Sequence, residues 1–163
     1  MNEQKDREFM LRAIELAKLA ASEGEVPVGA VIVDSKTGEV VSEAYNRRER
    51  GKNAIAHAEI LAIQNACKER DGWRLCNCTL YVTLEPCPMC AGAIVNSRID
   101  RVVFGAEDML AGCCGSVIDF NSYPFNHSFS VTRGICADEC NRLLSDFFVK
   151  RRREGDRPDK KFE

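Results

Sequence analysis

The sequence has no long hydrophobic run, no excess of either charge and only two histidines. Its 163 residues include 23 Lys and Arg against 25 Asp and Glu, which excludes a generally basic nucleic-acid coat and leaves only local surfaces for RNA. No stretch approaches the roughly 18 uninterrupted apolar residues of a membrane span, and residues 1–20 lack the apolar block of a signal peptide. We therefore expect a cytoplasmic protein without a membrane segment.

Internal repeats, low-complexity tracts and linkers rich in proline or serine are also missing, so the chain offers no boundary between domains. With 45% hydrophobic residues, it can bury one sizeable core without help. We expect a single domain over residues 1–153 and a polar tail at 154–163 that frays.

Cysteine, by contrast, is abundant. The nine cysteines are an odd number in a chain long enough to fold without covalent cross-links, so a disulfide framework is a poor explanation for them. We expect reduced thiols, some of them available to a metal.

Segments with helical spacing alternate with short strand-like runs, which is typical of an α/β domain. Helices are predicted at Arg7–Ser22 with Asp6 as N-cap, at Ala56–Lys68, at Pro88–Ser97, and over an amphipathic stretch that ends in Lys150–Arg153. Strands are predicted at Val28–Val33 and Val40–Tyr45, joined as a hairpin, and at Thr79–Leu84 and Arg101–Gly105. The segment from Ala106 to Ser130 is predicted to be mostly irregular, and loops of that length are often functional.

Two short segments carry residues suited to metal chemistry. Cys87 and Cys90 lie three apart at the start of a predicted helix, where both sulfurs can reach one tetrahedral cation. His57 is the one histidine in a comparably constrained position, and three protein ligands leave the fourth position of a zinc ion open, as in catalytic sites. The sequence therefore predicts a catalytic zinc rather than a structural one.

Glu59 lies two residues from His57, and residues two apart on a helix do not share a face, so it is not expected to bind the metal. A carboxylate beside the metal can take a proton from a water molecule and hand it to a leaving group. We expect Glu59 to be the catalytic acid and base of a hydrolysis.

His57-x-Glu59 followed by Pro86-Cys87-x-x-Cys90 is identified as the signature of zinc-dependent nucleobase deaminases. Over about Arg7 to Arg153 the chain resembles the bacterial tRNA-specific adenosine deaminases within that superfamily. The resembling segments are Glu25–Val31, Asn46-Arg47, Ala56–Ile60, Leu80–Ala93, Ser97–Ile99, Arg101–Gly105 and Leu143–Phe148.

The resemblance implies a cytidine-deaminase-like fold with three layers, in which a five-stranded mixed sheet carries helices on both faces. It implies a homodimer with one zinc ion per subunit, bound by His57, Cys87 and Cys90. The implied reaction converts adenosine to inosine at the wobble position of an arginine tRNA anticodon, with attack at C6 and loss of ammonia. The resemblance also assigns substrate-binding roles to Asn46, Ala58, Asp108 and Arg152.

Some residues depart from that family or allow more than one interpretation. Leu110 stands where many members carry lysine, and Cys113 and Cys114 replace residues that are usually small, so the chain departs from the family in a loop implied to contact the anticodon stem-loop. Asn46 could instead close a turn at the end of its strand. His127 could touch RNA or satisfy a loop.

Basic residues cluster at Lys150–Arg153 and at Arg47, Arg48, Arg50 and Lys52, where they could bind phosphates or remain solvated. The remaining seven cysteines are expected to form no second zinc site.

Three functions fit these observations. The first is an RNA-editing adenosine deaminase. The second is a deaminase of free cytosine, guanine or deoxycytidylate, because attack on cytosine or adenine uses the same zinc machinery. The third, an inactive zinc-bearing scaffold, is weakened by Glu59, which a scaffold would not need.

Overall fold

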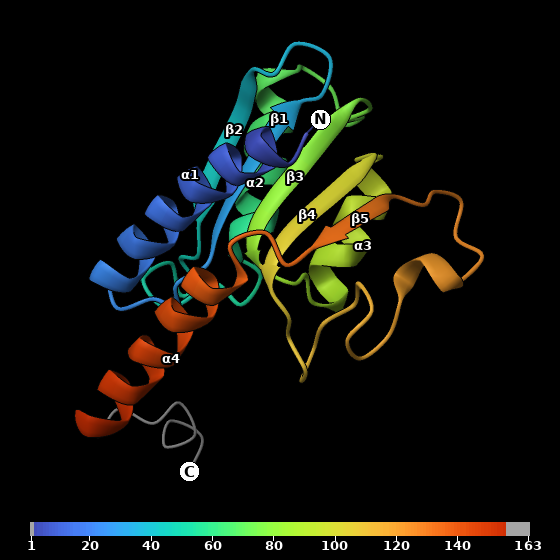
Figure 1. The fold of residues 1–163 in the computed structure, drawn as a ribbon. Helices are drawn as coiled ribbons and strands as arrows, with labels where there is room; N and C mark the ends of the chain where they lie inside the picture. The colour runs from blue at the N-terminus through green and yellow to red at the C-terminus, as the bar shows by residue number, and fades with distance from the viewer. Residues whose placement is uncertain (1, 156–163) are drawn as a thin grey trace.

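The computed structural model describes residues 2–155, so the predicted tail at 154–163 lies mostly outside the described residues. Its elements in chain order are α1 (Glu3–Ser22), β1 (Gly29–Asp34), β2 (Val40–Tyr45), α2 (Ala58–Glu69), β3 (Cys78–Leu84), α3 (Pro88–Ser97), β4 (Arg101–Ala106), the short 3-10 helix η1 (Phe120–Ser122), β5 (Ser130–Arg133) and α4 (Ala137–Arg153). The alternation confirms the predicted α/β class (Figure 1).

The strands form one five-stranded mixed sheet in the order β2-β1-β3-β4-β5. β1 pairs antiparallel with both β2 and β3, whereas β3, β4 and β5 run parallel. The parallel strands β3 and β4 therefore end at the same edge of the sheet, and that edge is the usual place for a ligand site in α/β proteins.

The sheet separates two hydrophobic layers because successive strand residues point to opposite faces. On one face, sheet residues such as Ile32 and Leu80 pack with α2 and α3. On the other face, Val31 and Tyr81 pack with α1 and with Cys140 of α4. Helices thus cover both faces, as the resemblance implied, with α1 and α4 together on one side (Figure 1).

The first helix begins earlier than predicted. Asn2, not Asp6, is its N-cap and accepts a hydrogen bond from the Lys5 amide at 3.0 Å. Asp6 is buried inside the first turns, where it pairs with Arg101 at 2.7 Å and accepts a hydrogen bond from the Tyr81 hydroxyl at 2.8 Å. The prediction of Asp6 as N-cap was wrong because a distant partner, which local sequence does not reveal, uses its carboxylate.

The segment predicted to be irregular is largely so, with η1 as its one helical turn. At its end, Ser130–Arg133 forms the fifth strand, which the residue pattern alone did not locate. This edge strand has four residues, two of them exposed, so it lacks the apolar run by which buried strands are identified. In the described part of the chain, none of the helices combines the length and the apolar character needed to span a bilayer.

Candidate active site

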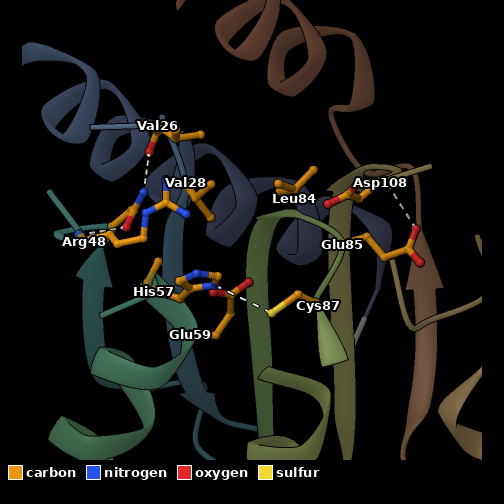
Figure 2. Close-up of a pocket in the computed structure, with 11 residues that line it drawn as sticks. Val26, Val28, Arg48, His57, Glu59, Leu84, Glu85, Cys87 and Asp108 are labelled. Atoms are coloured by element: carbon orange, nitrogen blue, oxygen red, sulfur yellow. Dashed lines mark hydrogen bonds between the residues drawn. The ribbon is translucent and has the colours of Figure 1, made fainter. Parts of the chain in front are cut away.

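A pocket of about 110 Å³ opens at the edge of the sheet where β3 and β4 end. Its lining combines apolar residues from the loop before β1 with polar residues from the starts of α2 and α3. The lining residues are Val26, Val28, Asn46, Arg48, His57, Ala58, Glu59, Leu84, Glu85, Cys87 and Asp108 (Figure 2).

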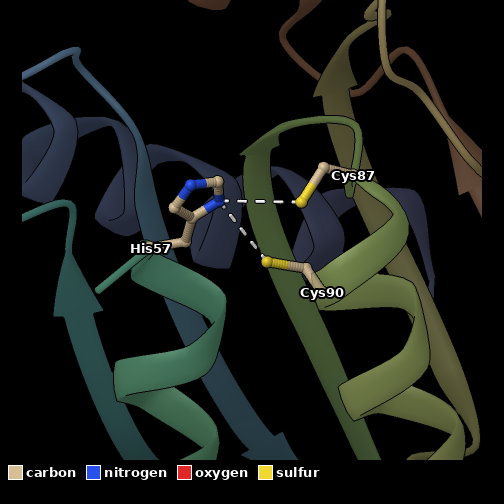
Figure 3. A group of neighbouring side chains, drawn as sticks. All are labelled: His57, Cys87 and Cys90. Atoms are coloured by element: carbon tan, nitrogen blue, oxygen red, sulfur yellow. Dashed lines mark hydrogen bonds between the residues drawn. The ribbon is translucent and has the colours of Figure 1, made fainter. Parts of the chain in front are cut away.

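The starts of two helices place the predicted metal ligands. His57 is the N-cap of α2 and Cys87 the N-cap of α3, where Pro88 occupies a position that favours proline. Cys90 lies one turn further along α3 and is buried. The two helix starts face each other across the pocket, so the three side chains converge (Figure 3).

The ligand atoms of these three residues have metal-site spacing. His57 Nδ1 lies 3.7 Å from the sulfur of Cys87 and 3.7 Å from that of Cys90, and all three atoms fall within 4.8 Å of one another. Zinc bonds of about 2.3 Å to sulfur and 2.0 Å to nitrogen, at tetrahedral angles, would separate sulfur from nitrogen by roughly 3.5 Å. The donor set and its spacing therefore fit zinc with one coordination position left open.

Hydrogen bonding favours the thiolate of one cysteine. A hydrogen bond from Cys90, followed in importance by one from His57, lowers the pKa of Cys87 to about 4. The same bond, together with burial, raises the pKa of Cys90, and the contact with Cys87 raises the pKa of His57. Negative charge is thus already stabilised at the position that would face a cation.

Glu59 lies in the first turn of α2 with 4% of its surface exposed. Burial raises the pKa of its carboxyl group, and its Oε2 accepts a hydrogen bond from the Cys90 sulfur at 3.4 Å. A carboxyl group whose pKa is raised in a pocket is suited to accept and release a proton during a reaction.

Asn46 lies at the end of β2. Its side-chain amide forms hydrogen bonds with the backbone, as expected from the alternative interpretation that Asn46 closes a turn. Its Nδ2 donates to the Val26 carbonyl at 3.2 Å, and its Oδ1 accepts from the Arg48 amide at 3.1 Å. The side chain still lines the pocket, and a primary amide has a second N–H and a second lone pair for a substrate. Both roles are geometrically compatible.

The other predicted substrate-binding residues divide into two groups. Ala58 and Asp108 line the pocket, although Asp108 Oδ1 also accepts from the backbone amides of Leu110 and Ala111. Arg152 is exposed near the end of α4 and is not among the lining residues. Any contact from Arg152 would be with a substrate that extends beyond the pocket.

The structure adds lining residues that sequence reasoning did not assign to the site. Arg48 belongs to the basic cluster already noted, and that cluster was the available signal. For Glu85, the sequence offered only one weak indication of a place in the site, namely its position just before the Pro86–Cys90 segment. Its burial and its partners depend on a loop more than 20 residues away.

His57, Cys87 and Cys90 are the one group of three potential metal ligands found among residues 2–155. Of the remaining seven cysteines, Cys76 is exposed, whereas Cys113 and Cys114 are buried in the loop after β4. His127 Nε2 contacts the Ile99 carbonyl oxygen at 2.7 Å, which fits the interpretation that it satisfies a loop.

Comparisons with known proteins agree with this geometry. The family model of the cytidine and deoxycytidylate deaminase zinc-binding region matches residues 3–106. A Bacillus subtilis (strain 168) protein named tRNA-specific adenosine deaminase is 49% identical over 150 residues, which cover 91% of this chain and 92% of that protein.

Solved structures show the same fold. One, described in a study of A-to-I editing by tRNA:A34 deaminases at the wobble position of transfer RNA, has a TM-score of 0.81 and 40% identity, covering 84% of this chain and 99% of its own. A guanine deaminase from Nitrosomonas europaea has a TM-score of 0.72 and 25% identity, and the match covers 86% of this chain and 82% of that chain. The chain belongs to the zinc-binding cytidine and deoxycytidylate deaminase family, within which it groups with the tRNA-specific adenosine deaminases.

Proposed function

We propose that this chain deaminates adenosine to inosine at the wobble position of a tRNA anticodon, with an arginine tRNA as substrate. The observation that carries the proposal is the convergence of His57, Cys87 and Cys90 beside the buried carboxyl group of Glu59, at the bottom of a pocket. The relatives named above supply the substrate class.

We propose one zinc ion per subunit, held by the His57 nitrogen and the sulfurs of Cys87 and Cys90. Their spacing and the thiolate character of Cys87 support this assignment. When bound, zinc supplies a Lewis acid that makes water a competent nucleophile near neutral pH.

The proposed role of Glu59 is to move the proton that hydrolytic deamination requires. Its carboxylate would take a proton from the attacking water and deliver it to the amino group leaving C6, so that inosine and ammonia are the products. Because the side chain is almost fully buried, few water molecules compete for that proton.

The pocket is small, so only one nucleobase of a large RNA would enter it, which requires the target base to leave the anticodon stack. Asn46 is proposed to hydrogen-bond that base, and Ala58 and Asp108, which also line the pocket, are proposed to contact it. Arg152 and its basic neighbours are proposed to bind phosphates, which would position the RNA without reading its sequence.

The second candidate function is deamination of a free base or nucleotide. The fold that this chain shares with a guanine deaminase favours it, at 25% identity. Against it stand the higher identity to tRNA deaminases and the basic end of α4, because a free base needs no phosphate contacts.

We further propose that residues 1–153 act as one zinc deaminase domain, that the chain forms a homodimer and that it works in the cytoplasm. The homodimer rests on the resemblance in sequence, and the other two statements rest on the composition and patterning of the chain. Size-exclusion chromatography with light scattering would test the homodimer directly.

The deciding experiment compares substrates for the zinc-loaded protein. We expect ammonia release and inosine formation with an arginine anticodon stem-loop that carries adenosine at the wobble position. Cytidine, guanine and deoxycytidylate, assayed in parallel, should release little ammonia. Turnover of a small molecule alone would retain the zinc chemistry and contradict the tRNA substrate.

A further inference from the structure

Glu85 is the residue at the end of β3 whose carboxylate the proposed reaction does not use. It is 2% exposed, and a buried carboxylate needs polar partners to offset its lost hydration. Figure 2 shows its side chain directed away from His57 and Cys87. Its burial therefore needs an explanation other than metal binding.

The hydrogen-bond partners of the Glu85 carboxylate all belong to one loop. Its Oε2 accepts hydrogen bonds from the backbone amides of Cys114 at 3.0 Å and Ser116 at 3.2 Å. Its Oε1 accepts from the Asp108 amide at 3.3 Å and from the Ser116 hydroxyl. The carboxylate thus anchors both ends of the segment Asp108–Ser116. Two irregular loops form the rim of the pocket, and we call residues 46–53 the first rim loop and residues 108–116 the second rim loop.

The loop passes directly over this carboxylate. A Cβ atom at Gly112 would overlap the Glu85 carboxylate, so the close approach requires a glycine. The Cys113 amide also donates to the Pro86 carbonyl at 2.9 Å, beside the side-chain anchors. An irregular segment is therefore fixed against the same strand end that leads into the metal-binding helix.

The part of the loop between the anchored residues places one side chain at the pocket and two others in solvent. Asp108 lines the pocket, whereas Met109 is 69% exposed and Leu110 94% exposed. Because the anchors lie on either side of this tip, they determine where Asp108 and the two apolar side chains stand.

We propose that Glu85 is a positioning residue for substrate binding, which holds the second rim loop in the shape that an anticodon stem-loop meets. The identity of the substrate rests on the proposed function, whereas the anchoring does not. A purely structural role would affect only stability. If Glu85 positions the loop, its substitution must change both the order of the loop and the KM for RNA.

The test substitutes Glu85→Gln in the zinc-loaded full chain. Glutamine has the same size, but its NH2 group would face backbone N–H donors whichever way the amide turns. We expect unchanged zinc content, amide exchange at Cys114 and Ser116 faster by about tenfold, and a KM for the arginine anticodon stem-loop about tenfold higher, with a smaller change in kcat.

Two further variants make the result specific. Glu107→Gln removes the same charge from an exposed position beside the loop, where Glu107 meets Arg133 at 3.8 Å, and should leave exchange and KM unchanged. Ser116→Ala removes one donor from the anchor and should shift both quantities in the same direction by a smaller factor. If Glu85→Gln does not fold, Ser116→Ala decides the question.

A Glu85→Gln protein with lower thermal stability but wild-type exchange and KM would overturn the proposal, as would equal effects from Glu107→Gln. If the wild-type protein forms no inosine in RNA, the proposed function fails separately. Amide exchange at Cys114 and Ser116 then decides alone whether Glu85 holds the loop.

Discussion

The pocket has two parts that are built in different ways. Its floor is formed by His57, Glu59 and Cys87, together with the buried Cys90 that contacts His57 and Glu59, and it comes from the first turns of α2 and α3. Its rim comes from two irregular loops, the first rim loop at residues 46–53 and the second rim loop at residues 108–116. Helical backbone hydrogen bonding fixes the floor, whereas the rim loops are held by buried carboxylates as well as by their own backbone hydrogen bonds.

A buried glutamate holds each rim loop. Glu25, which is 0% exposed, accepts from the backbone amides of Glu49 at 3.0 Å and Arg50 at 2.7 Å in the first rim loop. Glu85 does the same for the second rim loop. The difference teaches that changes in the floor should abolish chemistry, whereas changes in the rim should weaken substrate binding and leave chemistry largely intact.

The largest effect is expected from Cys87→Ala in the floor. Loss of one of three ligands should remove zinc and bring inosine formation below detection. Emission spectroscopy of the purified protein measures the zinc content, and Cys76→Ala, at an exposed position outside the site, is the matched control. Full zinc occupancy in Cys87→Ala would contradict the ligand assignment.

Glu59→Gln tests the other function of the floor. The variant keeps the size of the side chain but cannot carry the proton, so kcat should fall by at least about 100-fold. Zinc content and the thermal midpoint should remain close to those of the wild type. Normal turnover with zinc bound would show that another group moves the proton.

Asn46→Ala tests whether the rim affects binding more than chemistry. It removes hydrogen bonds to the Val26 carbonyl and the Arg48 amide, together with the proposed contact to the base. We expect kcat/KM for the stem-loop to fall roughly tenfold, mainly through KM. A loss confined to kcat would assign Asn46 to the chemical step and blur the distinction between floor and rim.

Asp6→Asn is a perturbation outside both regions. Burial acts to raise the pKa of Asp6, but hydrogen bonds from Arg101 and Tyr81 outweigh it and lower the pKa. The variant should lose about 2 kcal/mol of unfolding free energy at pH 7, with kcat and KM unchanged, as chemical denaturation and steady-state assays would reveal.

The sign of the pH dependence follows from the lowered pKa. Asp6 stabilises the protein above the ordinary aspartate pKa of about 3.9, and this contribution is lost as the pH falls through its lower folded-state pKa. The stability difference between the wild type and Asp6→Asn should therefore shrink below about pH 4. A difference that grows in acid would contradict this account.

The smallest effect is expected from Arg152→Gln, at a residue that does not line the pocket. Loss of one phosphate contact should weaken stem-loop binding a few-fold. It should also make the slope of log K against log salt concentration shallower by about the amount that one phosphate contact contributes. Binding titrations at several salt concentrations measure both quantities. An unchanged salt dependence would remove Arg152 from the RNA surface.

The floor could be predicted from sequence because its residues lie in two short segments, each of which carries its own local pattern. A His-x-Glu start and a Cys-x-x-Cys helix turn are local patterns, and helix geometry fixes which atoms can converge. That the two segments come together in space does not follow from these local patterns, and this was inferred from the resemblance to the family.

The rim could not be predicted in the same way. Glu25 meets Glu49 and Arg50 across more than 20 residues, and Glu85 meets Cys114 across 29. The incorrect N-cap at Asp6 has the same cause, because its partner Arg101 lies 95 residues away. A side chain that serves a distant backbone leaves no periodic signal in the sequence.

The most direct test of the account maps inosine along an intact arginine tRNA after incubation with the zinc-loaded wild type or with Glu59→Gln of equal zinc content. We predict inosine at the wobble adenosine alone with the wild type and none with the variant. Inosine at several adenosines, or equal conversion by the variant, would contradict the assignment of Glu59 and the pocket floor to wobble deamination.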